Sequence, residues 1–399
     1  MSQIVSFAAS TRRAGSLLLV ASVVLGAQAT SGRAVADESL AKLTASNATP
    51  FDQLGQSAAI SGDTIVVGTT SGIVGNTVHG IAHVFVEPAS GWSGRLHEAA
   101  TLIPSDGDNF DSFAVSVAVS GDTIVVGAYE HDIAGSEDVG AAYVYVRPPG
   151  GWAGTLTETA KLTASDGAIN DTLGMAVAMS GDTIAAGARP TIGANPGQGA
   201  VYVFIEPAGG WAGELAESAK LTASDGKAFD ELGSRVSLDG GTIVASALFA
   251  DLAPRENQGA AYVFVEPAGS WAGELTENAK LTASDANVMD QFGDGIAVSG
   301  PVVVVGVFNG EVGSQRDQGY AAVFVEPPGG WAGNLNETLK LAAPDGVAQD
   351  HFGDSAAVEN GVVVVGCPFD GPEIGEHPGS AYVFSGIGAK RVLPDQSRP

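Results

Sequence analysis

The sequence has few of the residues on which several protein classes depend. Cys367 is its one cysteine among 399 residues, so an intramolecular disulfide is impossible. Basic residues number 18 against 45 acidic ones, and the formal net charge is −27 at pH 7. A surface this negative repels the phosphates of nucleic acids and of anionic lipids, and we expect no nucleic-acid partner.

Long hydrophobic runs are also missing from the body of the chain. The N-terminus has the pattern of an export signal, because Arg12 and Arg13 precede a short apolar run at 16–26. We predict a signal peptide at residues 1–29, with cleavage as late as residue 36 as the alternative. Sec and twin-arginine export both stay open. The mature chain is predicted to have no transmembrane segment and to be extracellular or at the cell surface, with the periplasm as an alternative.

Catalytic signatures are absent as well. The chain has no G-x-S-x-G elbow, no H-E-x-x-H zinc motif and no P-loop, and its six histidines are scattered. We therefore predict a protein that is not an enzyme. An enzyme whose site is assembled from distant segments stays open as an alternative.

What the sequence does contain is a repeat of about 60 residues. The segment Ser-Gly-Asp-Thr-Ile-Val-Val-Gly occurs at 61–68 and again at 120–127, and four weaker copies follow. An aspartate precedes each copy, at Asp52, Asp111, Asp171, Asp230, Asp290 and Asp350. Tryptophans recur with the same period, at Trp92, Trp152, Trp211, Trp271 and Trp331. This regularity indicates an array of six units.

Each unit has the pattern of four short β-strands, which in the second repeat we predict at 114–119, 123–128, 141–146 and 160–164. Apolar residues alternate with period two, and Gly or Pro bounds each run. Such sheets cannot bury both faces alone, and stacking them around an axis solves this. We predict an all-β, six-bladed β-propeller of four-stranded antiparallel blades. A linear solenoid is the alternative, but it requires polar capping repeats.

The ends of the array predict how the ring closes. The sixth repeat stops after its third strand at 380–384, and the missing Lys-Leu-Thr-Ala strand stands at 42–45. We predict that the N-terminal strand completes the last blade, that the propeller spans 40–386, and that 387–399 is a disordered tail. The lysines of the fourth strands are predicted to lie on outer edges, where charge discourages edge pairing. They are Lys42, Lys161, Lys220, Lys280 and Lys340.

The motifs resemble a known family. Asp-x-Phe-Gly at 290–293 and 350–353, Val-Val-Gly-Ala at 125–128 and Tyr-Val-Phe at 202–204 are similar to the FG-GAP repeat in its bacterial variants. That repeat forms the N-terminal propeller of integrin α chains, which has seven blades rather than six. The resemblance implies ligand binding on the face that bears the loops between strands two and three. The family's calcium loop shrinks here to Ser-Gly-Asp-Thr, so its metal site is not carried over.

An up-and-down blade brings its 2–3 and 4–1 connections to one end, and the 2–3 loops here are all different. We predict that this face binds an extracellular protein or glycan and that the protein is a monomer. An enzyme acting on polysaccharides or phosphoesters at the channel, or a calcium-stabilised surface protein, are the alternatives. The predicted ligand-face residues are Tyr129, Glu130, Asp132, Glu137, Asp138, Arg189, Asp251, Arg255, Glu256, Arg316, Asp317 and Glu373.

Acidic side chains gather on the same face. Asp106, Asp108 and Asp111 are candidate ligands for Ca²⁺, which takes several oxygens, and no other cofactor is predicted. The competing and favoured interpretation of the six periodic aspartates is that each caps its own turn through a bond to a backbone amide. For the tryptophans packing is favoured over sugar binding, and for Cys367 a small buried role is favoured over a reactive thiol.

Overall fold

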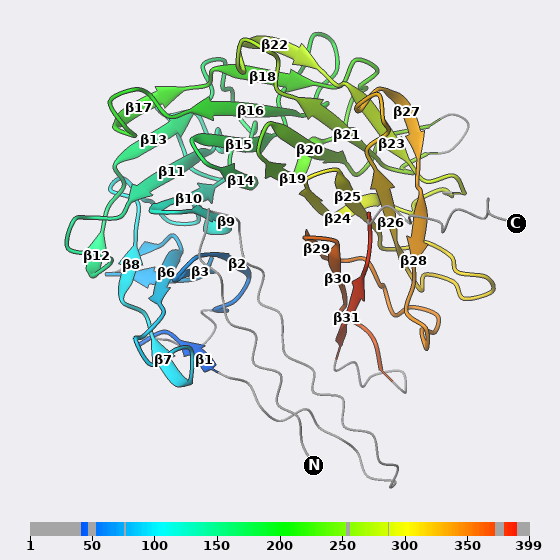
Figure 1. The fold of residues 1–399 in the computed structure, drawn as a ribbon. Coiled ribbons are helices and arrows are strands. Elements are labelled where there is room, and N and C mark those ends of the chain that lie inside the picture. Colours follow the sequence, from blue (N-terminus) through cyan, green and yellow to red (C-terminus); the bar gives the residue numbers. More distant parts are fainter. Residues whose placement is uncertain are drawn as a thin grey trace, which may run out of the picture.

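The computed structural model describes residues 41–46, 53–75, 77–252, 256–285, 287–371 and 379–388. Within these ranges every regular element is a β-strand, and six blade sheets fan out around a common centre, with two further two-stranded sheets beside them (Figure 1). The prediction of an all-β, six-bladed propeller is confirmed. The predicted signal peptide and all but residues 387 and 388 of the predicted tail lie outside the described residues.

The three inner strands of each blade form an antiparallel meander. The first strands are β2 (Ser57–Ser61), β9 (Phe113–Ser120), β14 (Ala176–Ser180), β19 (Leu232–Asp239), β24 (Phe292–Ser299) and β29 (Ala356–Glu359). The second strands are β3 (Thr64–Thr69), β10 (Thr123–Ala128), β15 (Thr183–Ala188), β20 (Thr242–Ala247), β25 (Val302–Val307) and β30 (Val362–Cys367). The third strands are β6 (Ile81–Val86), β11 (Ala141–Val146), β16 (Ala200–Ile205), β21 (Ala260–Val265), β26 (Tyr320–Val325) and β31 (Ser380–Ser385).

Outside the third strand lies the predicted fourth strand and then a fifth that was not predicted. The fourth strands are β8 (Ala100–Leu102), β13 (Ala160–Thr163), β18 (Ala219–Thr222), β23 (Ala279–Thr282) and β28 (Leu339–Leu341). The fifth strands β12 (Gly154–Leu156), β17 (Gly213–Ala216), β22 (Gly273–Thr276) and β27 (Gly333–Asn336) come from the next repeat and pair in parallel with the fourth strand. Repeats two to five therefore each add an outer strand to the blade before them.

The fifth strand corrects the prediction for Lys161, Lys220 and Lys280, whereas Lys340 lies on β28, the outer strand of its sheet among the described residues. Lys220 and Lys280 were expected on an outer edge, but β22 and β27 cover their strands and only 9% and 7% of these residues is exposed. Their charge therefore does not serve to protect a free edge. Each lysine instead contacts an aspartate and a tyrosine of its own blade.

The closing of the ring also differs from the prediction. Strand β1 (Ala41–Thr44) pairs in parallel with β7 (Gly94–His97), in the register that joins fourth to fifth strands elsewhere. Among the described residues β31 has a ladder only with β30, and Figure 1 places β1 and β31 on opposite sides of a gap. Val383 on β31 is 52% exposed, whereas Val144 at the same position of β11 is fully buried. The N-terminal strand thus joins its fifth-strand partner but does not complete the last blade.

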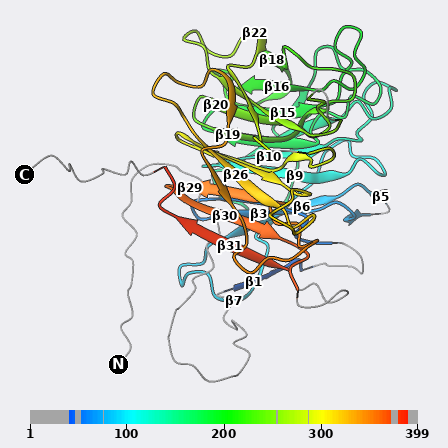
Figure 2. The same cartoon turned by 90° about the vertical axis from the view of Figure 1, so that its right-hand side faces the viewer.

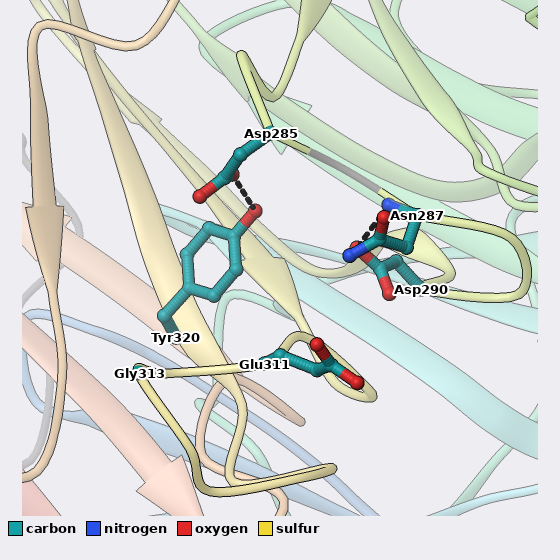
Figure 3. Close-up of a pocket in the computed structure, with 6 residues that line it drawn as sticks. All are labelled: Asp285, Asn287, Asp290, Glu311, Gly313 and Tyr320. Atoms are coloured by element: carbon teal, nitrogen blue, oxygen red, sulfur yellow. Dashed lines mark hydrogen bonds between the residues drawn. The ribbon is translucent and has the colours of Figure 1, made fainter.

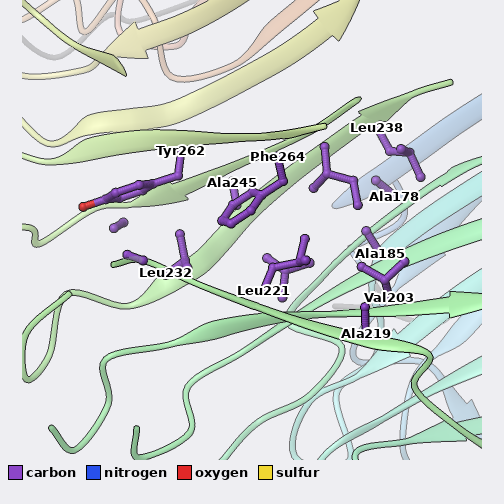
Figure 4. Packing of buried hydrophobic residues seen from close by; sticks show 14 of the residues in the cluster. Ala178, Ala185, Val203, Ala219, Leu221, Leu232, Leu238, Ala245, Tyr262 and Phe264 are labelled. Carbon is purple, nitrogen blue, oxygen red and sulfur yellow. The ribbon is translucent and has the colours of Figure 1, made fainter. Parts of the chain in front are cut away.

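The hydrophobic core lies between neighbouring blades. Figure 4 shows one such interface, where Ala185, Val203 and Leu221 of one sheet face Tyr262 and Phe264 of the next. All five side chains are at most 1% exposed. Burial of a large apolar side chain stabilises a fold by about 1.5–3 kcal/mol, and small alanines opposite the aromatic rings allow the sheets to approach closely.

The periodic tryptophans belong to these interfaces. Trp152, Trp211, Trp271 and Trp331 are 2–5% exposed and each lies in an inter-blade cluster, so the predicted packing role is confirmed. Cys367 is buried too, its Sγ lies 3.2 Å from the Asp350 carbonyl oxygen, and burial raises the pKa of the thiol to about 12. Ile387, the first residue of the predicted tail, packs against the last blade and donates its amide to Gly361.

Candidate binding face

The 2–3 and 4–1 loops lie together on one face, as the up-and-down connectivity requires. Figure 2 views the molecule from the side, with the small hairpin of β4 (Ile73–Val74) and β5 (Thr77–Val78), part of the first 2–3 loop, at its edge. Backbone bonds join the five 4–1 loops between successive blades to the 2–3 loop of the preceding repeat. Their donors and acceptors are Phe110 to Val78, Asn170 to Glu137, Phe229 to Pro196, Met289 to Glu256 and Gln349 to Arg316, at 2.7–3.2 Å. The two loop sets therefore form one continuous surface, which we call the composite loop face.

The periodic aspartates anchor the 4–1 loops. In each case Oδ2 accepts the amide of the residue three positions earlier, at 2.6–2.8 Å. The pairs are Asp108 N to Asp111, Ala168 N to Asp171, Lys227 N to Asp230, Asn287 N to Asp290 and Val347 N to Asp350. The capping interpretation is confirmed for these five, and Asp52 lies outside the described residues. Burial raises the pKa of Asp171, Asp230 and Asp350 despite these bonds.

A second group, the four Asp–Tyr–Lys clusters, ties the 4–1 loops that enter the second to fifth blades to the third and fourth strands of those blades. In the fourth blade the Tyr262 hydroxyl donates to Asp225 Oδ1 at 2.9 Å, and Lys280 Nζ lies 2.6 Å from Oδ2 and 5.0 Å from the tyrosine ring. Burial alone would raise the pKa of Asp225, but the bonds from Lys280 and Tyr262 outweigh it and the pKa is lowered. The other clusters are Asp106–Tyr143–Lys161, Asp166–Tyr202–Lys220 and Asp285–Tyr320–Lys340.

The cluster of the second repeat contains two of the predicted calcium ligands. Lys161 Nζ lies 2.7 Å from Asp106 and 2.9 Å from His131 Nε2, while His131 Nδ1 lies 2.9 Å from Asp111. Lysine, histidine and backbone amide thus already hold the carboxylates that a cation would need. Within the described ranges, no three Asp, Glu, His or Cys side chains are grouped so as to hold an ion.

The same three positions of the fifth repeat open into a pocket. Asp285, Asn287 and Asp290 line a cavity of about 200 Å³ together with Tyr320 and Glu311 (Figure 3). Gly310 stands where the second repeat has His131, and a side chain there would collide with the ring of Tyr320. The blades therefore share one framework and differ in what fills it.

The predicted ligand-face residues that the structure describes all belong to this face. Asp132 accepts the Asp138 amide at 2.9 Å, Glu130 accepts the Ser112 hydroxyl, and the carbonyl of Glu137 holds the next loop. Burial and the carboxylates of Glu130, Asp132 and Glu137 raise the pKa of Asp138. Burial and the neighbouring Glu130 also raise the pKa of Tyr129.

The predicted residues of the later repeats support the loops or pair with neighbours. Arg189 forms an ion pair with Glu231 at 3.1 Å, and Arg316 forms one with Asp317 at 3.4 Å. The Asp251 carboxylate accepts the Asn257 amide. The Glu256 carbonyl holds Met289. Arg255 and Glu373 lie outside the described residues.

Sequence reasoning missed the apolar tips of the 4–1 loops. Phe110 is 75% exposed, Ile169 55%, Phe229 64% and Met289 56%. A comparison of the segments before each periodic aspartate would have found them, since an apolar residue stands one or two positions earlier in four successive repeats.

These features define a β-propeller in which loops of variable sequence are hydrogen-bonded to one another and form one face of a repeated framework. The model of the FG-GAP repeat matches the chain six times, at 38–85, 96–145, 156–204, 215–264, 275–324 and 335–384. The chain therefore belongs to the FG-GAP repeat family. Each matched unit begins at the outer strands and ends with the third strand, so it crosses the boundary between two blades.

Two further comparisons complete this identification. No curated protein matches the chain. Among solved structures it is similar to the crystal structure of the WD40 beta propeller domain of Doa1, with 11% identity, 85% of this chain and 95% of that chain covered, and a TM-score of 0.40. No helix of the described residues is long and apolar enough to cross a membrane.

Proposed function

We propose that this protein is a secreted, non-enzymatic binding module of the adhesion type that recognises a protein or glycan through the composite loop face. The observation that carries the proposal is the bonding of each 4–1 loop to a 2–3 loop of different sequence. A rigid surface built from divergent loops on a uniform framework suits recognition. The N-terminal export pattern supports secretion.

Binding to an immobilised panel of extracellular matrix proteins and glycans tests this proposal. We expect the wild-type protein to bind a member of the panel, and the pair of substitutions Glu137→Lys and Glu256→Lys to weaken that binding by about tenfold or more. Glu266→Lys, an exposed acid in a 3–4 loop at the other end of the blades, is the matched control and should bind as the wild type does. Equal loss in the control, or no binding at all, contradicts the proposal.

Calcium at Asp106, Asp108 and Asp111 stays a prediction, and the melting temperature tests it. A cation that binds the native state must raise the melting temperature, and this one must displace Lys161 and His131. If calcium binds at this place, the melting temperature rises on calcium titration and the rise is lost in Asp106→Asn. A melting temperature that does not respond to calcium contradicts the prediction.

A further inference from the structure

The exposed apolar side chains of this protein are concentrated on one face. Eleven large apolar residues in the described ranges are more than a third exposed, and eight of them belong to the 2–3 and 4–1 loops. These eight are Ile73, Phe110, Ile169, Phe229, Val288, Met289, Val347 and Phe369. The other three, Val265, Leu339 and Val383, are scattered over strands. Apolar groups gathered on one surface mark an interaction site more often than single exposed residues do.

At three of these tips the backbone has a conformation that is unfavourable for a bulky side chain. Phe110, Phe229 and Met289 occupy the same loop position with φ of 73°, 65° and 66°, in the left-handed region. Asn170 holds this position in the third repeat with φ of 64°. Asparagine and glycine adopt this conformation readily, whereas bulky side chains are strained in it. Neither burial nor local geometry therefore explains these apolar side chains.

The loop at 129–140 connects two of the apolar tips and carries negative charge. Its Glu130 accepts the hydroxyl of Ser112 in the loop of Phe110, and its Glu137 carbonyl holds the loop of Ile169. Four carboxylates lie on this loop, and Asp108, two residues before Phe110, is an exposed acid of the neighbouring 4–1 loop. Phe110 and Ile169 are therefore two exposed apolar side chains with the acidic loop at 129–140 between their loops.

The charge decides between the candidate occupants. An anionic membrane or a nucleic acid would be repelled by these carboxylates, and a neutral glycan would leave them without counter-charges. A protein segment that alternates basic and apolar side chains satisfies both features at once, because its bases pair with the acids while its apolar groups cover the tips.

We propose that Phe110, Ile169 and the acidic loop at 129–140 between them bind a cationic amphipathic protein segment. This inference rests on the proposed function, because it names the partner of the same face. The apolar tips supply the anchors, and the carboxylates select a basic partner and speed its approach.

Labelled synthetic peptides of equal length are the probes: a Lys/Leu amphipathic peptide, a Lys/Ser peptide of the same charge and a Ser/Leu peptide without charge. Fluorescence anisotropy should show the Lys/Leu peptide binding about tenfold or more tightly than either other peptide. Phe110→Asn with Ile169→Ser should weaken its binding about tenfold, and Glu137→Gln with Asp138→Asn should weaken it and reduce its dependence on salt. Leu339→Asn, an exposed apolar residue away from the face, should bind as the wild type does.

The melting temperature separates this role from a structural one. Phe110→Asn should leave the melting temperature unchanged or higher, since asparagine suits the left-handed backbone, while binding falls. Equal affinity for the Lys/Ser and Lys/Leu peptides overturns the inference. So does sedimentation with zwitterionic vesicles in place of peptide binding, which would assign the tips to a membrane.

The inference and the proposed function can fail separately. A glycan or neutral protein whose binding is lost in Glu137→Lys with Glu256→Lys, but kept in Phe110→Asn with Ile169→Ser, overturns the inference and supports the proposed function. If all these variants bind every probe as the wild type does, both are overturned.

Discussion

Replacing Gly306 with alanine is expected to destabilise the protein strongly. A Cβ at Gly306, on the second strand of the fifth blade, would lie 1.8 Å from the carbonyl oxygen of Gly353 in the next blade. Because the clashing atom belongs to the backbone, a change of side-chain rotamer cannot relieve the clash. The two blades must therefore move apart. Overpacking of a core costs about 1–3 kcal/mol, and we expect the upper part of this range. Thermal unfolding followed by circular dichroism measures the loss.

Gly329→Ala is the matched control for this substitution. Gly329 lies in a 3–4 loop of the same repeat, and a Cβ there would meet nothing within 4 Å. Its melting temperature should stay within about a degree of the wild type, because surface substitutions away from contacts rarely matter. In the fourth repeat the position equivalent to Gly306 is occupied by Ser246. A Cβ at Gly293 of the next blade would lie 2.5 Å from the Cβ of this serine. A Gly306→Ala protein as stable as the Gly329→Ala protein would show that the blades do not meet as described.

Asp225→Asn is expected to have the next largest effect. The change leaves the ammonium group of Lys280, whose side chain is 9% exposed, without its carboxylate. A fully buried pair broken in this way costs about 3–5 kcal/mol, but the Asp225 side chain is 52% exposed and water compensates in part. We therefore expect about 1–2 kcal/mol, measured by chemical denaturation at pH 7.

The pH dependence gives this prediction a second readout. The folded-state pKa of Asp225 is lowered, so its contribution to stability is fully present above the unfolded value of about 3.9 and is lost as the pH falls below it. The difference in stability between the wild type and Asp225→Asn should shrink as the pH falls through about 4. The raised pKa of Asp230 makes its contribution to stability change with pH in the opposite direction. Asp230 is present in both proteins, so this contribution cancels in the difference between them.

A double variant tests the physical cause. Asp225→Asn with Lys280→Met removes both charges, and it should be more stable than Asp225→Asn alone because no unpaired charge stays buried. A double variant less stable than the single one, or a difference that does not change between pH 7 and pH 3, would contradict the ion pair as the source of the stabilisation.

The strands were predictable because each obeys a local rule. In the second repeat the strands predicted at 123–128 and 141–146 match β10 and β11 residue for residue, and 114–119 falls within β9. The fifth strand was missed because Gly154–Leu156 is three residues long and its partner is β8 of the preceding blade. No local pattern records a parallel pairing across a blade boundary.

The candidate site was predictable in place but not in detail. The connectivity correctly predicted that the 2–3 and 4–1 loops lie together at one end, and five of the six periodic aspartates are confirmed as caps. The partners of the lysines could not be found, because Lys280 and Asp225 are 55 positions apart and meet only when the sheet is folded. A comparison of the repeats would have found the apolar residues before the periodic aspartates, but only the path of the folded loops shows that Phe110 and Phe229 face water.

The sequence by itself determined that this protein is an array of six β-sheets, because alternating apolar residues and a period near 60 leave faces that only neighbouring sheets can cover. Tertiary structure decided which fifth strand pairs with which blade and where β1 lies, since these pairings join residues from different repeats. It also decided which acids are neutralised by lysines and which apolar side chains face water. Those contacts join residues that are far apart in the sequence and close in the folded chain, so the local sequence around each residue does not predict them.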